Sequence, residues 1–109
     1  MRTVSNTSPI SNLAIVGQLE LLKHQFHEVL IPPAVLTECG RIADPLSRET
    51  IMHAVERGWL VVRPVGDLKL VELLLSDLHR GESEAIALAR ETKADLLLLA
   101  QVRHQRGQK

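Results

Sequence analysis

The chain has 109 residues, of which 45% are hydrophobic and 24% charged, and its formal charge at pH 7 is zero. This length predicts one domain with a small core. Phe26 and Trp59 are the aromatic residues, so the core must be aliphatic and offers no aromatic stacking platform for single-stranded nucleic acid. The zero net charge argues against strong non-specific binding to DNA.

Charge is unevenly distributed along the chain. The basic residues Arg103, Arg106 and Lys109 lie in 101–109, which contain no acid, and this leaves a net charge of −3 for residues 1–100. We therefore expect a mildly acidic domain followed by a basic C-terminal tail. Cys39 is the single cysteine, which excludes an internal disulfide, and no signal peptide or span of roughly 20 apolar residues is visible. These features predict a cytoplasmic protein that has no membrane partner.

Short apolar segments alternate with helical patterns. The expected strands are 2–6, 28–32, 59–64 and 94–99. The expected helices are 9–17, 19–26, 33–39, 47–57, 68–78 and 81–92. Four consecutive leucines in the last strand are typical of burial on both faces, and Ser8 and Asp67 are candidate N-caps of the helices that follow them. The alternation predicts βαβ units and a parallel four-stranded sheet.

Polar side chains lie where the expected strands end, the edge at which ligands gather in parallel sheets. They are Asn6, Thr7 and Ser8 after the first strand, Glu38 on the helix after the second, and Glu82 and Glu84 at the start of the last helix. Carboxylates that converge from separate elements are typical of an Mg²⁺ or Mn²⁺ site, and such ions activate water in nuclease chemistry.

Ordinary structural roles stay open for the same residues. Acids in a first helical turn are favoured by the helix dipole, and Glu84 is a candidate capping-box residue. Residues two apart on a helix point about 200° apart, so at most one of Glu82 and Glu84 faces the site well, and Glu84 is favoured. Glu38 alone is typical of a solvated helix, and Cys39 of a small buried side chain. The histidines are isolated in sequence, which argues against a zinc site.

Three blocks of sequence, taken in order, carry a resemblance to a known family. They are "VSNTSPISNLAIVGQLELLKHQFHEVLIPPAVLTE", "GWLVVRPV" and "LHRGESEAIALARETKADLLLL". Together they resemble the PIN-domain superfamily, and more closely its small prokaryotic members akin to toxin-antitoxin ribonuclease toxins. The resemblance covers nearly all of residues 3–99, and its strongest part is "RGESEAIALA". It implies a three-layer α/β/α sandwich and an Mg²⁺- or Mn²⁺-dependent ribonuclease that uses three or four acidic residues.

The resemblance also implies roles for individual residues. Metal ligands fall on Asn6, Glu38 and Glu84, and catalytic roles fall on Glu38, Glu84 and Glu82. Substrate contacts fall on Thr7, Ser8 and Arg80.

The sequence departs from the family pattern after the last strand. The fourth acid would stand at Ala100 or Gln101, and neither carries a carboxylate. An asparagine oxygen at position 6 can still contact a metal, but an alanine cannot. We therefore expect weak binding of Mg²⁺ or Mn²⁺ and weak or lost catalysis.

A second departure concerns the length of the chain. Members of the family continue with further helices and a strand, so we expect an incomplete PIN-like domain over 1–100, with its C-terminal part missing, and a basic tail over 101–109. A bare edge of the last strand predicts association of chains into a homo-oligomer. The resemblance implies RNA and an antitoxin-like protein as partners. Two alternatives remain: a non-catalytic RNA- or protein-binding module that retains the fold, and an unrelated small regulatory α/β domain.

Overall fold

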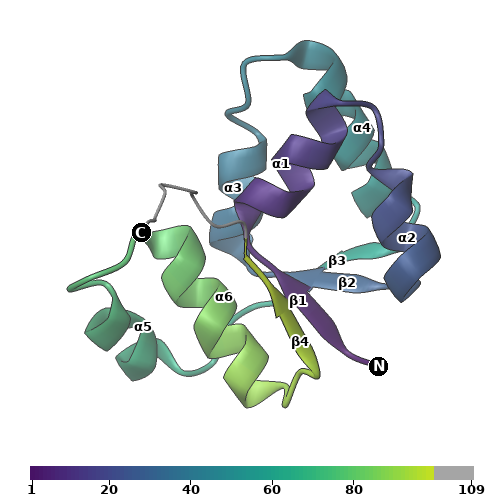
Figure 1. Cartoon of the computed structure of the whole chain (residues 1–109). Coiled ribbons are helices and arrows are strands. Elements are labelled where there is room, and N and C mark those ends of the chain that lie inside the picture. Colours follow the sequence, from purple (N-terminus) through teal and green to yellow (C-terminus); the bar gives the residue numbers. More distant parts are fainter. Residues whose placement is uncertain (100–109) are drawn as a thin grey trace, which may run out of the picture.

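Two layers of helices enclose a parallel sheet in the computed structural model, which describes residues 1–99 (Figure 1). The strands are β1 (Thr3–Ser5), β2 (Val29–Ile31), β3 (Leu60–Val62) and β4 (Leu96–Leu98). The helices are α1 (Thr7–Ile15), α2 (Glu20–Phe26), α3 (Pro33–Cys39), α4 (Pro45–Glu56), α5 (Leu68–Leu74) and α6 (Arg80–Glu91). The predicted α/β class with a four-stranded parallel sheet is confirmed.

The strand order is β3-β2-β1-β4, and every neighbouring pair is parallel. Val4 of β1 therefore has Leu30 on one side and Leu97 on the other. Because all strands run the same way, their carboxyl ends lie at one edge of the sheet, and α1 and α3 begin there.

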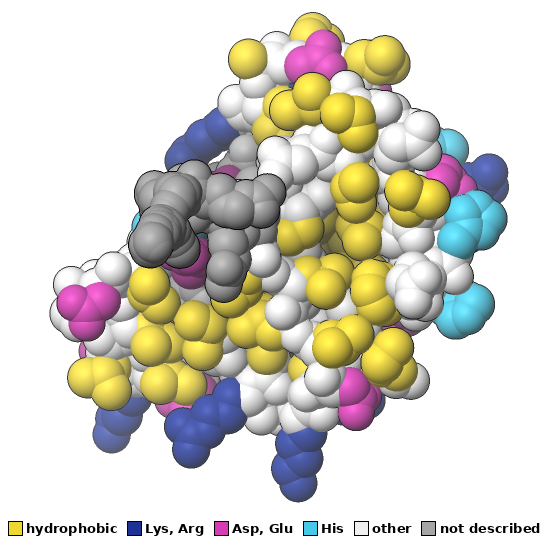
Figure 2. Space-filling model, in the orientation of Figure 1, with side chains coloured by type: hydrophobic (Ala, Val, Ile, Leu, Met, Phe, Trp, Pro, Cys, Tyr) yellow, Lys and Arg dark blue, Asp and Glu magenta, His cyan; other side chains and the backbone are white. Residues whose placement is uncertain are grey.

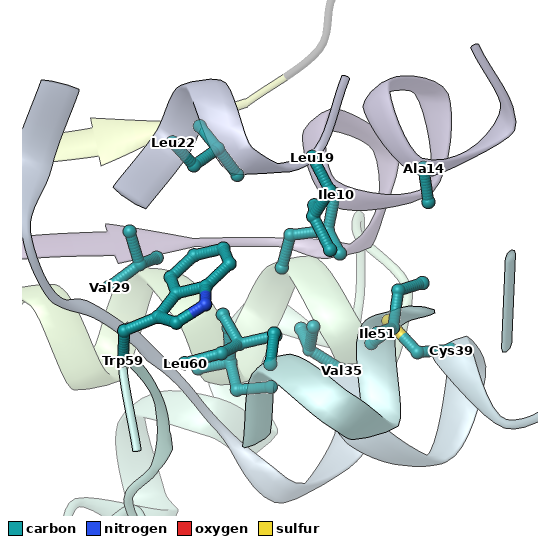
Figure 3. Close-up of a cluster of buried hydrophobic side chains, with 12 residues drawn as sticks. Ile10, Ala14, Leu19, Leu22, Val29, Val35, Cys39, Ile51, Trp59 and Leu60 are labelled. Carbon is teal, nitrogen blue, oxygen red and sulfur yellow. The ribbon is translucent and has the colours of Figure 1, made fainter. Parts of the chain in front are cut away.

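The larger part of the core lies between the sheet and α1–α4 (Figure 3). Its buried side chains come from all four helices and from β2 and β3: Ile10, Ala14, Leu19, Leu22, Val29, Ile31, Val35, Cys39, Ile51, Ala54, Trp59 and Leu60. The indole of Trp59 lies beside Val29 and Leu60 and is 6% exposed. The other buried members of the cluster are aliphatic side chains and Cys39, and Phe26 packs against the cluster from outside.

The opposite face of the sheet is covered by α6, whose Ala85 and Leu88 pack on Val4 and Leu30. Small side chains on α6 allow the helix to lie close to the strands. The carboxylate of Glu91, at the end of α6, accepts the backbone N–H groups of Gly66 (2.9 Å) and Asp67 (3.1 Å). These bonds fix the start of α5 against the end of α6.

The predicted burial of the last strand on both faces is wrong. Leu96 is 39% exposed, and Leu97 and Leu98 are half-buried. The reason is topological, since β4 is an edge strand whose one neighbour in the described sheet is β1.

Several helix boundaries also differ from the sequence prediction, by one to four residues. The helix expected at 47–57 begins at Pro45, because Asp44 accepts the Ser47 N–H and caps it. The helix expected to reach residue 78 ends at Leu74, and the backbone N–H groups of Ser76 and Asp77 then bond to the carbonyls of Leu73 and Leu74 in a turn of the i→i−3 type. Helix α1 begins one residue before the predicted cap Ser8, with Asn6 at the N-cap position.

The expectations for the C-terminal residues and for a membrane span have different outcomes. The basic tail predicted over 101–109 and the candidate positions Ala100 and Gln101 lie outside the described residues. Within residues 1–99, the helices lack the combination of length and apolar character that a membrane crossing requires.

Candidate functional site

Glu38 is the centre of a group of polar side chains at the carboxyl edge of the sheet. Helix α3 follows β2 and carries Glu38 next to the start of α1, where the Thr7 hydroxyl donates a hydrogen bond to Glu38 Oε1. Glu38 Oε2 lies 3.7 Å from Nδ1 of His79, at the start of α6. The Glu38 side chain is 30% exposed, so it is hydrogen-bonded within the protein and also partly accessible to solvent.

His79 joins Glu38 to Glu82. It is the N-cap residue of α6, and its Nδ1 accepts the backbone N–H of Glu82 at 3.4 Å. The other ring nitrogen, Nε2, lies 3.4 Å from Glu82 Oε1. His79 is not among the predicted site residues, because the histidines stand isolated from one another in the sequence. The available signal was its place immediately before the "RGE" helix start, a position where side-chain acceptors cap helices.

Glu84 has a different environment from Glu82, as their spacing on the helix predicts. Its Oε1 accepts the Ala34 N–H at 3.0 Å, and its Oε2 lies 3.4 Å from Nη1 of Arg80. Helix α3 begins at Pro32-Pro33 and has no side-chain cap of its own, so Glu84 supplies an acceptor from α6 for a free backbone N–H. The carboxylate is 14% exposed, and it binds the neighbouring helix instead of closing a capping box in its own.

Asn6 contributes a buried oxygen without a partner. The residue is 4% exposed, and its backbone N–H donates to the Leu98 carbonyl at 3.1 Å, which ties it to β4. Its Oδ1 is buried and has no hydrogen-bond partner in the described part of the chain. Such atoms are rare in folded proteins, because leaving a buried polar group unsatisfied costs about 1–3 kcal/mol.

The structure thus brings some of the predicted site residues together and leaves others apart. Thr7, Glu38 and Glu82 share one cluster through His79. Glu84 and Arg80 lie in a neighbouring pair at the α3–α6 interface. Ser8 is half-buried in the first turn of α1, where its carbonyl accepts the Ser11 hydroxyl.

Comparison with known families assigns the fold. A family model described as a PIN domain matches residues 2–105. The chain belongs to the PIN-domain family. No curated protein and no solved structure matches the chain. The match confirms the family that the three sequence blocks indicated, and it makes a nuclease-type site at the carboxyl edge the one to evaluate.

The donors in this PIN domain fit a divalent cation in chemical type. PIN domains generally use divalent metals, and Mg²⁺ and Mn²⁺ prefer oxygen ligands. The unpartnered Oδ1 of Asn6 and the partly exposed carboxylate of Glu38 are such oxygens. Among residues 1–99, however, no three His, Cys, Asp or Glu side chains form a group that could hold a metal ion. The residues therefore offer the kind of oxygen ligand that a divalent cation prefers, but few of these ligands are charged.

Cys39, next to Glu38 in the PIN domain, is a buried and inert thiol. Burial, and secondarily the charge of Glu38, raises the pKa of Cys39 from 9.0 to about 12. The thiolate is the nucleophilic form, so reaction with iodoacetamide at pH 8 is expected to require unfolding.

The raised pKa of Cys39 also predicts a pH dependence of stability. Below pH 9 the thiol is protonated in both the folded and the unfolded state. Between pH 9 and about pH 12 the unfolded state loses the proton first, so this group makes the free energy of unfolding fall as pH rises, by up to about 1.4 kcal/mol per pH unit. Urea unfolding of wild type and Cys39→Ala at pH 8 and pH 10.5 tests this. The wild type is expected to lose more stability than the variant, and equal losses would contradict the prediction.

Proposed function

We propose that this PIN domain derives from the toxin-type ribonucleases and holds Mg²⁺ or Mn²⁺ weakly through Asn6, Glu38 and Glu84, with little or no hydrolysis of RNA. The observation that carries the proposal is the placement of Glu38. A carboxylate held by Thr7 on one side and facing His79 on the other lies at the edge where parallel sheets bind ligands.

Each residue has a distinct part in this proposal. Glu38 and Asn6 supply oxygens to the ion. Glu84 supplies Oε2, which then gives up its ion pair with Arg80. Arg80, which is 60% exposed, is then available to a phosphate of RNA, as is the polar start of α1 at Thr7 and Ser8. Glu82 orients His79. A bound ion would activate water and stabilise negative charge on a phosphoryl oxygen.

Weak binding follows from the charge of these ligands. Glu38 and Glu84 bring two negative charges and Asn6 is neutral, whereas sites for hard divalent cations depend on several carboxylates. Glu84 is also already engaged by Ala34 and Arg80, so its participation requires rearrangement. Ala100 and Gln101 offer no carboxylate at the position that the family pattern assigns to the fourth acid.

An RNA cleavage assay with Mn²⁺ tests the proposal. We expect no turnover, or a trace of it that EDTA removes, from the wild-type chain. Robust turnover that is abolished by Glu38→Ala would show that catalysis survives and would overturn this part of the proposal. Turnover that persists in Glu38→Ala would show that the activity does not come from this site.

A second candidate is a non-catalytic RNA-binding module that retains the fold. Both oxygens of Glu84 have protein partners, and no group of three metal-type side chains occurs in residues 1–99, which favours this candidate over an efficient enzyme. Gel-shift measurements in EDTA distinguish it. Retention of RNA that is weakened by Arg80→Ala supports this candidate, and absence of retention at low salt contradicts it and directs attention to a small protein partner of the antitoxin kind.

We also propose that two chains associate through β4. Hydrophobic side chains are spread over the face of the molecule shown in Figure 2. Ile15 of α1, Leu21 of α2 and Leu96 of β4 are among the exposed large hydrophobic side chains. Edge strands normally carry charges or proline that prevent pairing, but β4 is all leucine. Antiparallel pairing of two copies of β4 places leucine opposite leucine at every position.

Light scattering during size exclusion tests this association. The wild-type chain is expected to give a dimer mass that falls toward the monomer on dilution. Leu96→Lys should shift the equilibrium to the monomer, whereas Leu73→Lys, on exposed α5, should leave it unchanged. A wild-type monomer at high concentration would contradict the proposal.

A further inference from the structure

Gly81 lies in the first turn of α6, directly against the carboxylate of Glu38. A Cβ atom on Gly81 would lie 2.6 Å from Glu38 Oε1 and 2.8 Å from Oε2. Real Cβ atoms do not approach oxygen this closely, so any side chain at position 81 requires Glu38 to move. We propose that Gly81 is a positioning residue for Glu38, and that the absence of its side chain creates the space in which the Glu38 carboxylate is held.

The glycine is not explained by backbone conformation. Its φ is not in the left-handed region, unlike the φ of Gly58, and the residue is fully helical. Alanine would be favoured over glycine at such a position by helix propensity. The requirement is therefore one of space, and the space is occupied by the carboxylate.

The other contacts of Glu38 limit where its carboxylate can go. The Thr7 hydroxyl donates to Oε1 from α1, and the imidazole of His79 lies beside Oε2. A methyl group at position 81 would push the carboxylate away from one or both of them. Because a glutamate side chain is flexible at its far end, the expected consequence is a displaced carboxylate in a folded protein.

The inference rests on the proposed function in one respect, which is that Glu38 is a ligand of the divalent cation. Residues that orient a metal ligand typically change metal affinity by about 10–100-fold when they are altered. Gly81→Ala is therefore expected to weaken Mn²⁺ binding at least about tenfold.

A double-variant cycle tests the inference. Glu38→Asp shortens the side chain by one methylene group and withdraws the carboxylate from position 81. In the Glu38→Asp background, Gly81→Ala should change Mn²⁺ affinity by less than about twofold, because the clash no longer exists. Gly40→Ala is the matched control, since a Cβ there meets its nearest atom, the Thr37 carbonyl oxygen, at 3.4 Å. Mn²⁺ binding is followed by electron paramagnetic resonance of the free ion.

Wild type, Gly81→Ala, Glu38→Asp and the double variant are also unfolded with urea in the absence of metal. This measurement does not depend on cation binding, so it tests the inference separately from the proposed function. Gly81→Ala changes the unfolding equilibrium constant by some factor in each background. We expect that factor to be at least about five times larger with Glu38 present than with Asp at position 38. Equal effects of Gly81→Ala in both backgrounds, on affinity and on unfolding, would overturn the positioning role. If wild type fails to bind Mn²⁺ but the unfolding effects are non-additive, the positioning role stands and the cation-binding proposal falls.

Discussion

Replacing Trp59 by alanine is expected to lower the free energy of unfolding by about 3–5 kcal/mol. Trp59 is 6% exposed and packs in the larger core cluster with Val29, Leu22 and Leu60 (Figure 3). Its backbone carbonyl also accepts the Val29 N–H at 2.8 Å, so the side chain lies where β2 and β3 pair. The loss is large for a domain of this size, because small domains are typically stable by about 5–15 kcal/mol.

Urea unfolding followed by circular dichroism measures this effect. Leu73→Ala, at a side chain that is 71% exposed on α5, is the control and should change stability by less than about 0.5 kcal/mol. Trp59→Phe should fall between the two, because it retains an aromatic ring but leaves part of the volume empty. Equal stabilities of the Trp59→Ala and Leu73→Ala variants would contradict the core described here.

Addition of Mn²⁺ is expected to raise the melting temperature of the wild-type chain and to leave that of Glu38→Ala unchanged. A ligand that binds the folded state stabilises it by mass action, and at about ten times the dissociation constant the gain is about 1.4 kcal/mol, or roughly 5–8 °C for a domain of this length. The Glu38 carboxylate is positioned by the Thr7 hydroxyl, and its side chain is partly exposed to solvent. Replacing Glu38 by alanine should therefore abolish the rise in melting temperature.

Two comparisons make this measurement specific. Glu72→Ala removes an exposed carboxylate from α5, a helix that contributes no residue to the proposed site, and should retain the full rise in Tm. Each variant is compared with itself in EDTA, so a change in its basal stability does not enter. A rise in Tm that survives in Glu38→Ala would place the cation elsewhere.

The sequence predicted the order of the elements because its signals are local. Pro33 at a helix start and apolar strands such as "VLI" each act over a few residues, and the structure confirms α3 and β2. The predicted length of α5 was wrong, since the apolar spacing continues to residue 78 but the backbone bonds at Ser76 and Asp77 are of the i→i−3 turn type. The burial of β4 could not be predicted from four leucines, since burial depends on a neighbouring strand and β4 lies at an edge.

The candidate site was predicted in part for the same reason. Parallel topology brings Thr7 and Glu38 to one edge of the sheet, and the structure joins them by a hydrogen bond. The contacts of Glu38 with His79 and Gly81 link residues about forty positions apart, and no periodicity in the sequence reveals them. The spacing of Glu82 and Glu84 indicated that the two face different surroundings. The residue beside His79 in the Glu38 cluster is Glu82, however, whereas the favoured Glu84 bonds to the Ala34 N–H.

A crystal structure of the chain with Mn²⁺, examined for anomalous scattering, tests the central claim most directly. We expect a peak within bonding distance of the Glu38 carboxylate and of the side-chain oxygens of Asn6 and Glu84. The Glu38 carboxylate should remain packed against Gly81. A crystal saturated with Mn²⁺ in which no ion lies at Glu38 would contradict the account.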